Sequence, residues 1–158
     1  MVQMSEIRTI ISADHVQEGL SCANKKALFQ QLGLLASRVL SLDSKTVVSA
    51  LTEREKLGST GFGSGVAIPH GKVAGLDKVV GLFVRLSAPI DFQSVDGLPV
   101  DLIFVLLSPP LAGAEHLKSL ASVSRLLRDK QMLAKLRGAS TTDAIYALLA
   151  GDEAFDAA

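Results

Sequence analysis

One histidine of this chain stands in a setting suited to chemistry. His70 lies between Pro69 and Gly71, directly after the short apolar run at residues 66–68. The proline fixes its own φ and offers no N–H to a sheet, and the residue before it is biased towards extended geometry. The glycine allows a sharp turn and places no side chain beside the ring. The pattern predicts an imidazole presented where a strand is interrupted, although a histidine beside a turn can also be an ordinary surface residue.

Arg54 is a charged residue in phase with an apolar helical face. It follows Val47 by seven residues and Leu51 by three, which is the spacing of the buried side of an amphipathic helix. A guanidinium in that position needs an anionic partner. The alternative is that Arg54 meets the last carbonyls of its helix or pairs with Glu53 or Glu55.

His116 has a similar setting at the start of another expected helix. It is in phase with Leu120, Val123 and Leu127, so its ring is expected to lean towards the apolar side. The alternative is a half-buried structural histidine with one hydrogen bond. The remaining histidine, His15, has no such setting and is assigned no role.

Two histidines and an arginine fit phosphoryl transfer better than metal binding or hydrolysis. The sequence holds no HxH or HxxxH pair for a metal and no G-x-S-x-G for a serine nucleophile. A neutral imidazole is a good nucleophile towards phosphorus near neutral pH, and the phosphorylated ring carries a nearly dianionic group. We therefore expect His70 to be the phosphorylated nucleophile, with Arg54 and His116 holding phosphoryl oxygens.

The glycine-rich segment 58–65 does not have the spacing of a nucleotide-binding loop. Five residues separate Gly65 from Gly71, and a valine follows Lys72, so the P-loop pattern fails. The dinucleotide fingerprint fails at its third glycine. We expect instead a loop folded tightly around a close group, with its backbone N–H groups, Thr60 and Gly71 adding phosphate contacts.

The first half of the chain predicts two helices followed later by two buried strands. Residues 24–40 form an amphipathic helix capped by Asn24, and Asp43 caps a second helix that ends near Gly58. Residues 79–86 and 100–107 are nearly continuous apolar runs, which is typical of strands buried on both faces. An Asp96-Gly97 turn signal lies between the two runs.

The last third of the chain is expected to be helical. An apolar stripe follows Gly113, Asp129 can cap a short helix that ends before Gly138, and Ser140 with Asp143 resembles a capping arrangement for a helix over residues 142–150. The stripe consists of Leu117, Leu120, Ala121, Val123 and Leu127. The tail over residues 151–158 is expected to fray. The order of helices and strands predicts an α/β fold, a single-domain sandwich with a mixed central β-sheet and helices on both faces.

Composition limits the classes of function. The chain has 158 residues, 48% of them apolar, and its 16 basic residues balance 16 acidic ones, so nucleic-acid binding is not expected. Cys22 is the only cysteine, which excludes an internal disulfide and favours a reducing compartment. No apolar run is long enough for a signal peptide or a membrane span. We expect a cytoplasmic protein without membrane insertion, metal or cofactor.

The combined motif resembles a known family. The strings at residues 52–55 and 58–71, together with Glu115-His116-Leu117, are similar to the enzyme IIA domain of the bacterial phosphotransferase system, fructose/mannitol type. The resemblance extends from about residue 10 to about residue 149, and it predicts one enzyme IIA type-2 domain over residues 1–158 with its core at about 10–149. It implies that His70 accepts a phosphoryl group on Nε2 from a histidine-containing phosphocarrier protein, with Arg54 and His116 in the same site.

The run at residues 99–104 is most similar to the nitrogen-regulatory branch of that family. This implies a regulatory phosphocarrier, related to nitrogen and potassium physiology, that acts on regulatory target proteins. Two alternatives remain: a sugar-transport enzyme IIA that passes phosphate to a separate enzyme IIB, and a binding module whose histidines are structural. A monomer or weak homodimer is expected.

Partners are expected to dock on an apolar patch around His70 that includes Phe62 and Ile68. Phe62 is an aromatic residue among glycines, with little local structure to bury it, and aromatic side chains are favoured at interface centres. The alternative is that Phe62 folds back into the core. Phosphorylation would put nearly two negative charges into this patch, so it is expected to act as a switch for partner binding.

Overall fold

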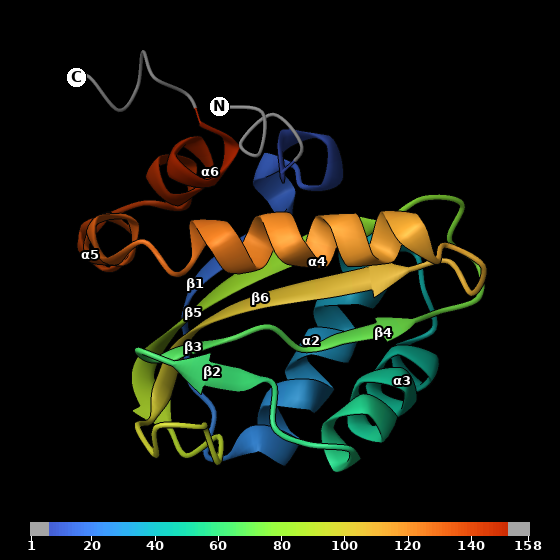
Figure 1. The fold of residues 1–158 in the computed structure, drawn as a ribbon, viewed down its shortest axis with the longest axis horizontal. Helices are drawn as coiled ribbons and strands as arrows, with labels where there is room; N and C mark the ends of the chain where they lie inside the picture. The colour runs from blue at the N-terminus through green and yellow to red at the C-terminus, as the bar shows by residue number, and fades with distance from the viewer. Residues whose placement is uncertain (1–6, 152–158) are drawn as a thin grey trace.

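The computed structural model describes residues 7–151 as a mixed six-stranded sheet between helices (Figure 1). The strands run in the order β1-β5-β6-β3-β2, and β4 also pairs with β6. Their bounds are β1 Val16–Leu20, β2 Gly61–Gly63, β3 Val66–Ala67, β4 His70–Lys72, β5 Val80–Ile90 and β6 Val100–Ser108. A helical segment at residues 7–10 and the 3-10 turn η1 (Ala13–His15) precede the first strand.

Strands β5 and β6 form the centre of the sheet. They are antiparallel, with Phe83 opposite Phe104, while β1 runs parallel to β5, and β3 and β4 run parallel to β6. Along β6, alternate side chains enter two separate apolar clusters, Leu102, Phe104 and Leu106 on one face and Ile103, Val105 and Leu107 on the other. The prediction that both apolar runs are buried on two faces is confirmed.

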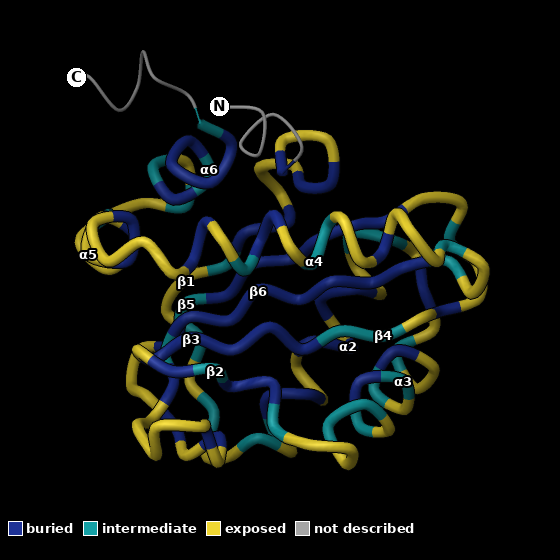
Figure 2. The backbone as a smooth tube through the Cα atoms, in the orientation of Figure 1, coloured by how far each residue is buried: buried dark blue, intermediate teal, exposed yellow. Residues whose placement is uncertain are grey.

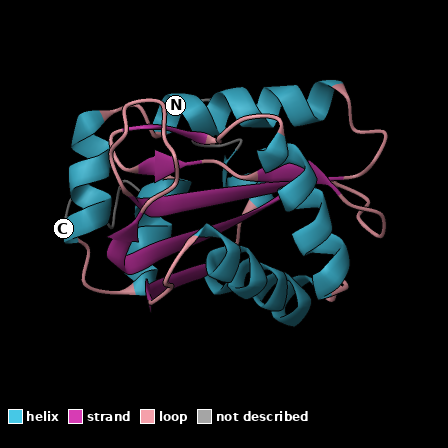
Figure 3. Ribbon diagram, turned by 90° about the horizontal axis from the view of Figure 1, so that it is seen from below, coloured by secondary structure: helices cyan, strands magenta, loops and turns pink. Residues whose placement is uncertain are grey.

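Helices cover both faces of this sheet, as the sequence predicts (Figures 1 and 3). Helices α2 (Lys25–Leu40) and α3 (Ser44–Lys56) lie on one face. Helices α4 (Ala114–Leu126), α5 (Lys130–Gly138) and α6 (Thr142–Ala150) lie on the other. The tube in Figure 2 shows the central strands as almost continuously buried, with exposure concentrated on the outer sides of the helices and in the loops.

Side-chain caps fix where most of these helices begin. Asn24, Asp43 and Asp129 accept backbone N–H groups at the starts of α2, α3 and α5, as expected. The cap of α6 differs by one residue from the expectation. Thr141, not Ser140, has the extended backbone of a cap, and its hydroxyl accepts the N–H of Ala144 at 3.1 Å.

Other differences from the expected elements follow from local geometry. Strand β1 carries a glutamine, a glutamate and a glycine, so no apolar run marks it in the sequence. Leu117 of the expected α4 stripe is exposed, because it lies about 100° round the helix from the buried His116. The glycine-rich segment contains strand β2, which pairs antiparallel with β3, where a loop folded tightly around a close group was expected. The expected fraying of the tail falls on residues 152–158, which lie outside the described part of the chain.

Candidate active site

His70 is the first residue of β4, which continues the line of β3 beyond a break at Pro69. It is in register with Leu106 of β6, whose side chain points to the face covered by α4. Because paired residues of neighbouring strands point to the same face, His70 points there too. The expectation that this histidine stands where a strand is interrupted therefore agrees with the structure.

The His70 ring is held by hydrogen bonds on both nitrogens. Nδ1 lies 2.8 Å from the carbonyl oxygen of Ile68, and Nε of Arg54 lies 3.1 Å from Nε2. A carbonyl can only accept and a guanidinium can only donate, so Nδ1 carries the proton and Nε2 accepts. The free lone pair of the neutral ring is thus on Nε2, directed at Arg54.

Arg54 reaches His70 from the last turn of α3. Its Nη1 also donates to the carbonyl oxygen of Gly58 at 2.8 Å. The neighbouring glutamates pair elsewhere, Glu53 with Lys56 and Glu55 with Lys25. No carboxylate in residues 7–151 forms an ion pair with Arg54. Its positive charge therefore lies beside His70 with only neutral acceptors.

His116, in the first turn of α4, places its ring beside the ring of His70. The ring centroids are 5.5 Å apart with an angle of 52° between the planes. Nδ1 of His116 is 2.6 Å from the hydroxyl oxygen of Ser108, which ends β6 and is fully buried. This serine was not among the predicted site residues, and its one sequence signal is a polar residue that closes a long apolar strand. His116 is thus fixed through Nδ1, and Nε2 is its second polar atom.

Burial favours the neutral form of both rings. It lowers the pKa of His70, and the positive charge of Arg54 lowers it further, against opposing effects of the Ile68 carbonyl and Glu55. Burial also lowers the pKa of His116, assisted by the charge that His70 carries when it is protonated and by the positive charge of Lys72. Near neutral pH, His70 therefore keeps the Nε2 lone pair that a nucleophile needs.

Gly71 allows α3 to approach the sheet closely. It is in register with Leu107, on the face opposite His70. A Cβ atom at this position would lie 3.1 Å from the Cβ of Ala50 and 3.2 Å from its backbone carbon. The glycine thus explains how Arg54, one turn further along α3, comes within hydrogen-bonding distance of His70. This is a packing role, and the expected phosphate contact of Gly71 stays a prediction.

Thr60 and its glycine-rich segment use their polar groups within the protein. The Thr60 hydroxyl donates to Oε1 of Glu55 at 2.7 Å, and its N–H donates to Oε2 at 3.0 Å. The N–H of Gly61 is bonded to Ser59, and that of Ser64 to Asp96. In the structure these groups therefore have partners within the protein, and the expected phosphate contacts from Thr60 and from these backbone groups stay a prediction.

The residues expected to meet a partner differ in exposure. Phe62 is half-buried, packs against the apolar cluster beneath α4, and has the guanidinium of Arg128 6.0 Å from its ring centre. Ile68 is only 4% exposed, so it belongs to the core and is corrected as a partner-facing residue. Two leucines that sequence reasoning missed are much more accessible: Leu57, next to the end of α3, is 84% exposed, and Leu111, before α4, is 97% exposed.

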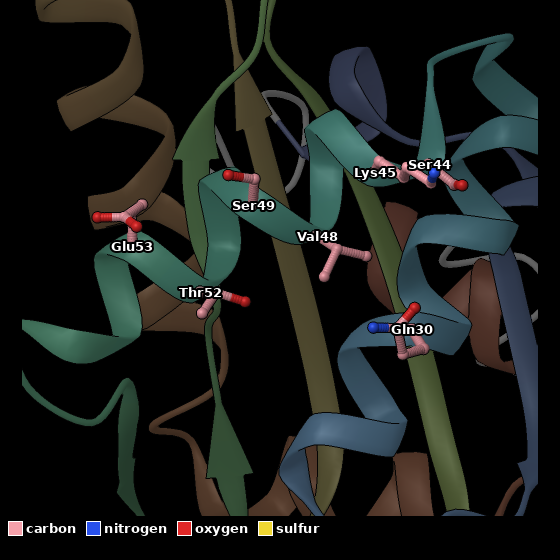
Figure 4. Close-up of a pocket in the computed structure, with 7 residues that line it drawn as sticks. All are labelled: Gln30, Ser44, Lys45, Val48, Ser49, Thr52 and Glu53. Carbon is pink, nitrogen blue, oxygen red and sulfur yellow. The ribbon is translucent and has the colours of Figure 1, made fainter.

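Among the residues that the structure describes, hollows lie beside the N-terminus of α4 and between α2 and α3, and neither of these is lined by His70. The larger one lies beside the N-terminus of α4 and includes Leu111 and Glu115. The smaller one lies between α2 and α3, where Glu53 also sits (Figure 4). Its lining consists of Gln30, Ser44, Lys45, Val48, Ser49, Thr52 and Glu53.

No group of three or more His, Cys, Asp or Glu side chains within residues 7–151 could hold a metal ion. None of the helices described there is long and apolar enough to cross a membrane.

Comparison with known proteins gives one consistent result. Residues 9–151 match the family model described as phosphoenolpyruvate-dependent sugar phosphotransferase system, EIIA 2. A nitrogen regulatory protein of Bradyrhizobium diazoefficiens is 46% identical over 144 residues, which cover 91% of this chain and 94% of that protein. The nitrogen regulatory protein of Escherichia coli is 36% identical over 149 residues, covering 94% and 91%.

A solved structure agrees with these sequence matches. The nitrogen regulatory protein IIA-Ntr from Neisseria meningitidis superimposes with a TM-score of 0.85 at 40% identity, covering 90% of this chain and 98% of that one. The motif around His70, Arg54 and His116 had predicted the same family. The match over nearly all described residues shows that this chain belongs to the EIIA type 2 family of the phosphoenolpyruvate-dependent sugar phosphotransferase system.

Proposed function

We propose that this chain is a regulatory phosphocarrier of the cytoplasm. His70 accepts a phosphoryl group from a histidine-containing phosphocarrier protein, and regulatory target proteins respond to whether the group is present. The observation that carries the proposal is the Nε2 lone pair of a neutral His70, 3.1 Å from the guanidinium of Arg54. The names of the relatives, nitrogen regulatory proteins, support a regulatory role linked to nitrogen.

The transfer step is a displacement at phosphorus. The Nε2 lone pair of His70 forms the new N–P bond while the N–P bond to the donor histidine breaks, and that bonding pair returns to the donor's ring nitrogen. Positive charge develops on the His70 ring as the new bond forms. The Nδ1–H bond to the Ile68 carbonyl, 2.8 Å long, stabilises that charge.

Arg54 and His116 would hold the arriving group. The guanidinium already lies at Nε2, so it can turn its donors from the ring nitrogen to a phosphoryl oxygen, where a charge-assisted bond is stronger. Nε2 of His116 can donate to another oxygen when its ring is in the Nε2–H form or protonated. In the Nε2–H form, the Ser108 hydroxyl donates to Nδ1, which is consistent with their 2.6 Å contact.

A labelling experiment tests this proposal. The purified chain is incubated with phosphoenolpyruvate, enzyme I and the phosphocarrier, and acid-labile phosphate is followed on wild type and on His70→Ala. Wild type should be labelled at His70 and the variant should remain unlabelled. An unlabelled wild type would point to a binding module with structural histidines, and full labelling of the variant would refute His70 as the acceptor.

Sugar transport is the alternative within the same family. A fructose-specific EIIA component of Haloferax volcanii is 31% identical over 150 residues, so a transport role has support among the relatives. The labelled chain is therefore mixed with separate enzyme IIB proteins. Rapid loss of label to a IIB protein would favour transport, and retention of label in their presence would favour the regulatory role.

A further inference from the structure

Next to Arg54 in sequence, Glu55 holds a buried carboxylate with three donors. Its side chain is 7% exposed, and Oε2 lies 2.8 Å from Nζ of Lys25. Thr60 adds its N–H at 3.0 Å and its hydroxyl at 2.7 Å. Lys25 in turn lies over the ring of Phe92, 4.4 Å from its centre. A carboxylate this buried is costly unless it is paired and hydrogen-bonded, and here both conditions are met.

We propose that Glu55 is a positioning residue for phosphoryl transfer. Together with Lys25 and Thr60 it closes the chain segment 57–60 into a fixed loop, and this loop sets the positions of both Arg54 and His70. The inference rests on the proposed function, and it assigns to Thr60 a role in geometry, with no contact to the phosphoryl group.

The first connection leads to Arg54. Glu55 lies in α3 just before this loop, Thr60 is its last residue, and Gly58 lies between them. The N–H of Gly58 donates to the backbone carbonyl of Glu55 at 3.1 Å, and its own carbonyl accepts Nη1 of Arg54 at 2.8 Å. If Thr60 is released from Glu55, the Gly58 carbonyl is no longer fixed, and the guanidinium loses the contact that directs Nε towards His70.

The second connection leads to His70. The carbonyl of Thr60 accepts the N–H of Ile68 at 3.1 Å. The carbonyl of the same Ile68 accepts Nδ1–H of His70 at 2.8 Å, which is the bond that fixes the ring tautomer. Three hydrogen bonds in series therefore lead from the Glu55 carboxylate through Thr60 and Ile68 to His70, and the loop that this carboxylate closes carries the Gly58 carbonyl that holds Arg54. A clamp that served stability alone would not need to lead to both.

The test measures transfer rate and donor affinity separately. The variants are Glu55→Gln, which removes the charge but keeps the shape, and Thr60→Val, which removes one hydroxyl and leaves the N–H bond. For both we expect the transfer rate at saturating phosphocarrier to fall about ten- to a hundredfold, because misplacement by about 1 Å has effects of this size. The phosphocarrier concentration at half-maximal rate should change less than about twofold. Thr60→Ser keeps the hydroxyl and should restore most of the rate.

A matched control is available at the turn between β2 and β3, which an ion pair between β6 and α5 holds. Asp101 pairs with Arg137 at 2.8 Å, and Arg137 donates to the carbonyl of Ser64 at 2.7 Å, so this carboxylate also holds a loop but leads to neither His70 nor Arg54. Asp101→Asn should transfer at the wild-type rate per folded molecule.

The ring ¹⁵N shifts of His70 supply a second readout. Glu55→Gln and Thr60→Val should move the ring from the Nδ1–H form towards a mixture of tautomers, and Asp101→Asn should not.

The outcomes separate this inference from the proposed function. If wild type takes up no phosphate, the proposed function fails, and the tautomer measurement still tests the positioning role. If wild type is labelled but folded Glu55→Gln and Thr60→Val transfer within about twofold of wild type and keep its tautomer, the positioning role is refuted. If Glu55→Gln does not fold, Thr60→Val and Thr60→Ser decide alone, because the first replaces the hydroxyl by a methyl group and the second keeps it.

Discussion

Replacing Arg54 by alanine removes a cation from the reacting nitrogen without touching the nucleophile itself. In the structure the guanidinium donates to Nε2 of His70 at 3.1 Å and to the carbonyl of Gly58 at 2.8 Å. The Gly58 contact is exposed to solvent, so water can take its place. The part-buried contact at Nε2 is the one that becomes charge-assisted when a phosphoryl group is present.

The size of the effect follows from that single contact. Hydrogen bonds to charged groups contribute about 1.5–3 kcal/mol. If this contact forms fully only as negative charge gathers on the transferred group, its loss lowers the transfer rate about ten- to a hundredfold. Arg54→Lys keeps the charge but loses the planar fork of donors, so its rate should lie between wild type and Arg54→Ala.

The assay is rapid-quench transfer from the labelled phosphocarrier, measured over a range of donor concentrations and pH. The rate should fall while the half-saturating donor concentration stays nearly constant. Removing the cation should also raise the pKa of His70, although burial, the larger cause of its lowering, remains, so the acid limb of the rate profile should move to higher pH. A variant that transfers at the wild-type rate with an unmoved acid limb would refute the assigned role of Arg54.

Three further predictions follow from the same site. Gly71→Ala should lower the free energy of unfolding by about 1–3 kcal/mol, because its Cβ would press on Ala50 of α3, whereas Gly138→Ala, which meets nothing within 4 Å, should not; chemical denaturation measures both. Folding lowers the pKa of His70 and of His116 from 6.5, so the unfolded chain binds more protons than the folded one. The free energy of unfolding should therefore be highest above about pH 6.5 and should fall as the pH drops through the folded pKa values. The fall should be smaller in a variant that carries both His70→Gln and His116→Gln. Unphosphorylated protein should bind a regulatory target at least about tenfold tighter than the phosphorylated form, and Phe62→Ala should weaken that binding at unchanged stability; equal titration curves for all forms would oppose docking on this face.

Local signals in the sequence were sufficient for most of the elements. Asn24, Asp43 and Asp129 mark helix starts because a capping side chain bonds within its own first turn. The long apolar runs of β5 and β6 mark buried strands because helices cover both of their faces. Strand β1 has no such run, because its middle side chains are partly exposed and need not be apolar. Its pairing with β5 is made by the backbone, which leaves no signal in the sequence.

The site was predictable as a set of residues but not as a set of contacts. Arg54 and His116 were identified because each is polar on an apolar helical face. Their partners come from elsewhere in the fold: Ser108 reaches His116 from the end of β6, and Glu55 binds Thr60 across a reversal of the chain. The glycines around Phe62 suggested a loop folded tightly around a phosphoryl group, yet the backbone of this segment pairs in the β2–β3 hairpin. No spacing rule in a single sequence encodes those pairings.

The last turn of α3 shows how one pair of neighbours can divide two tasks. Had Arg54 and Glu55 paired with each other, the site would hold no free positive charge. Instead Glu55 turns to Lys25 and Thr60, while Arg54 meets only neutral acceptors at His70 and Gly58. Neutral acceptors fix the direction of the guanidinium without cancelling its charge. The cation is therefore already in place when the nearly dianionic phosphoryl group arrives, and no carboxylate partner has to be displaced from it. The group can be received without a change of fold.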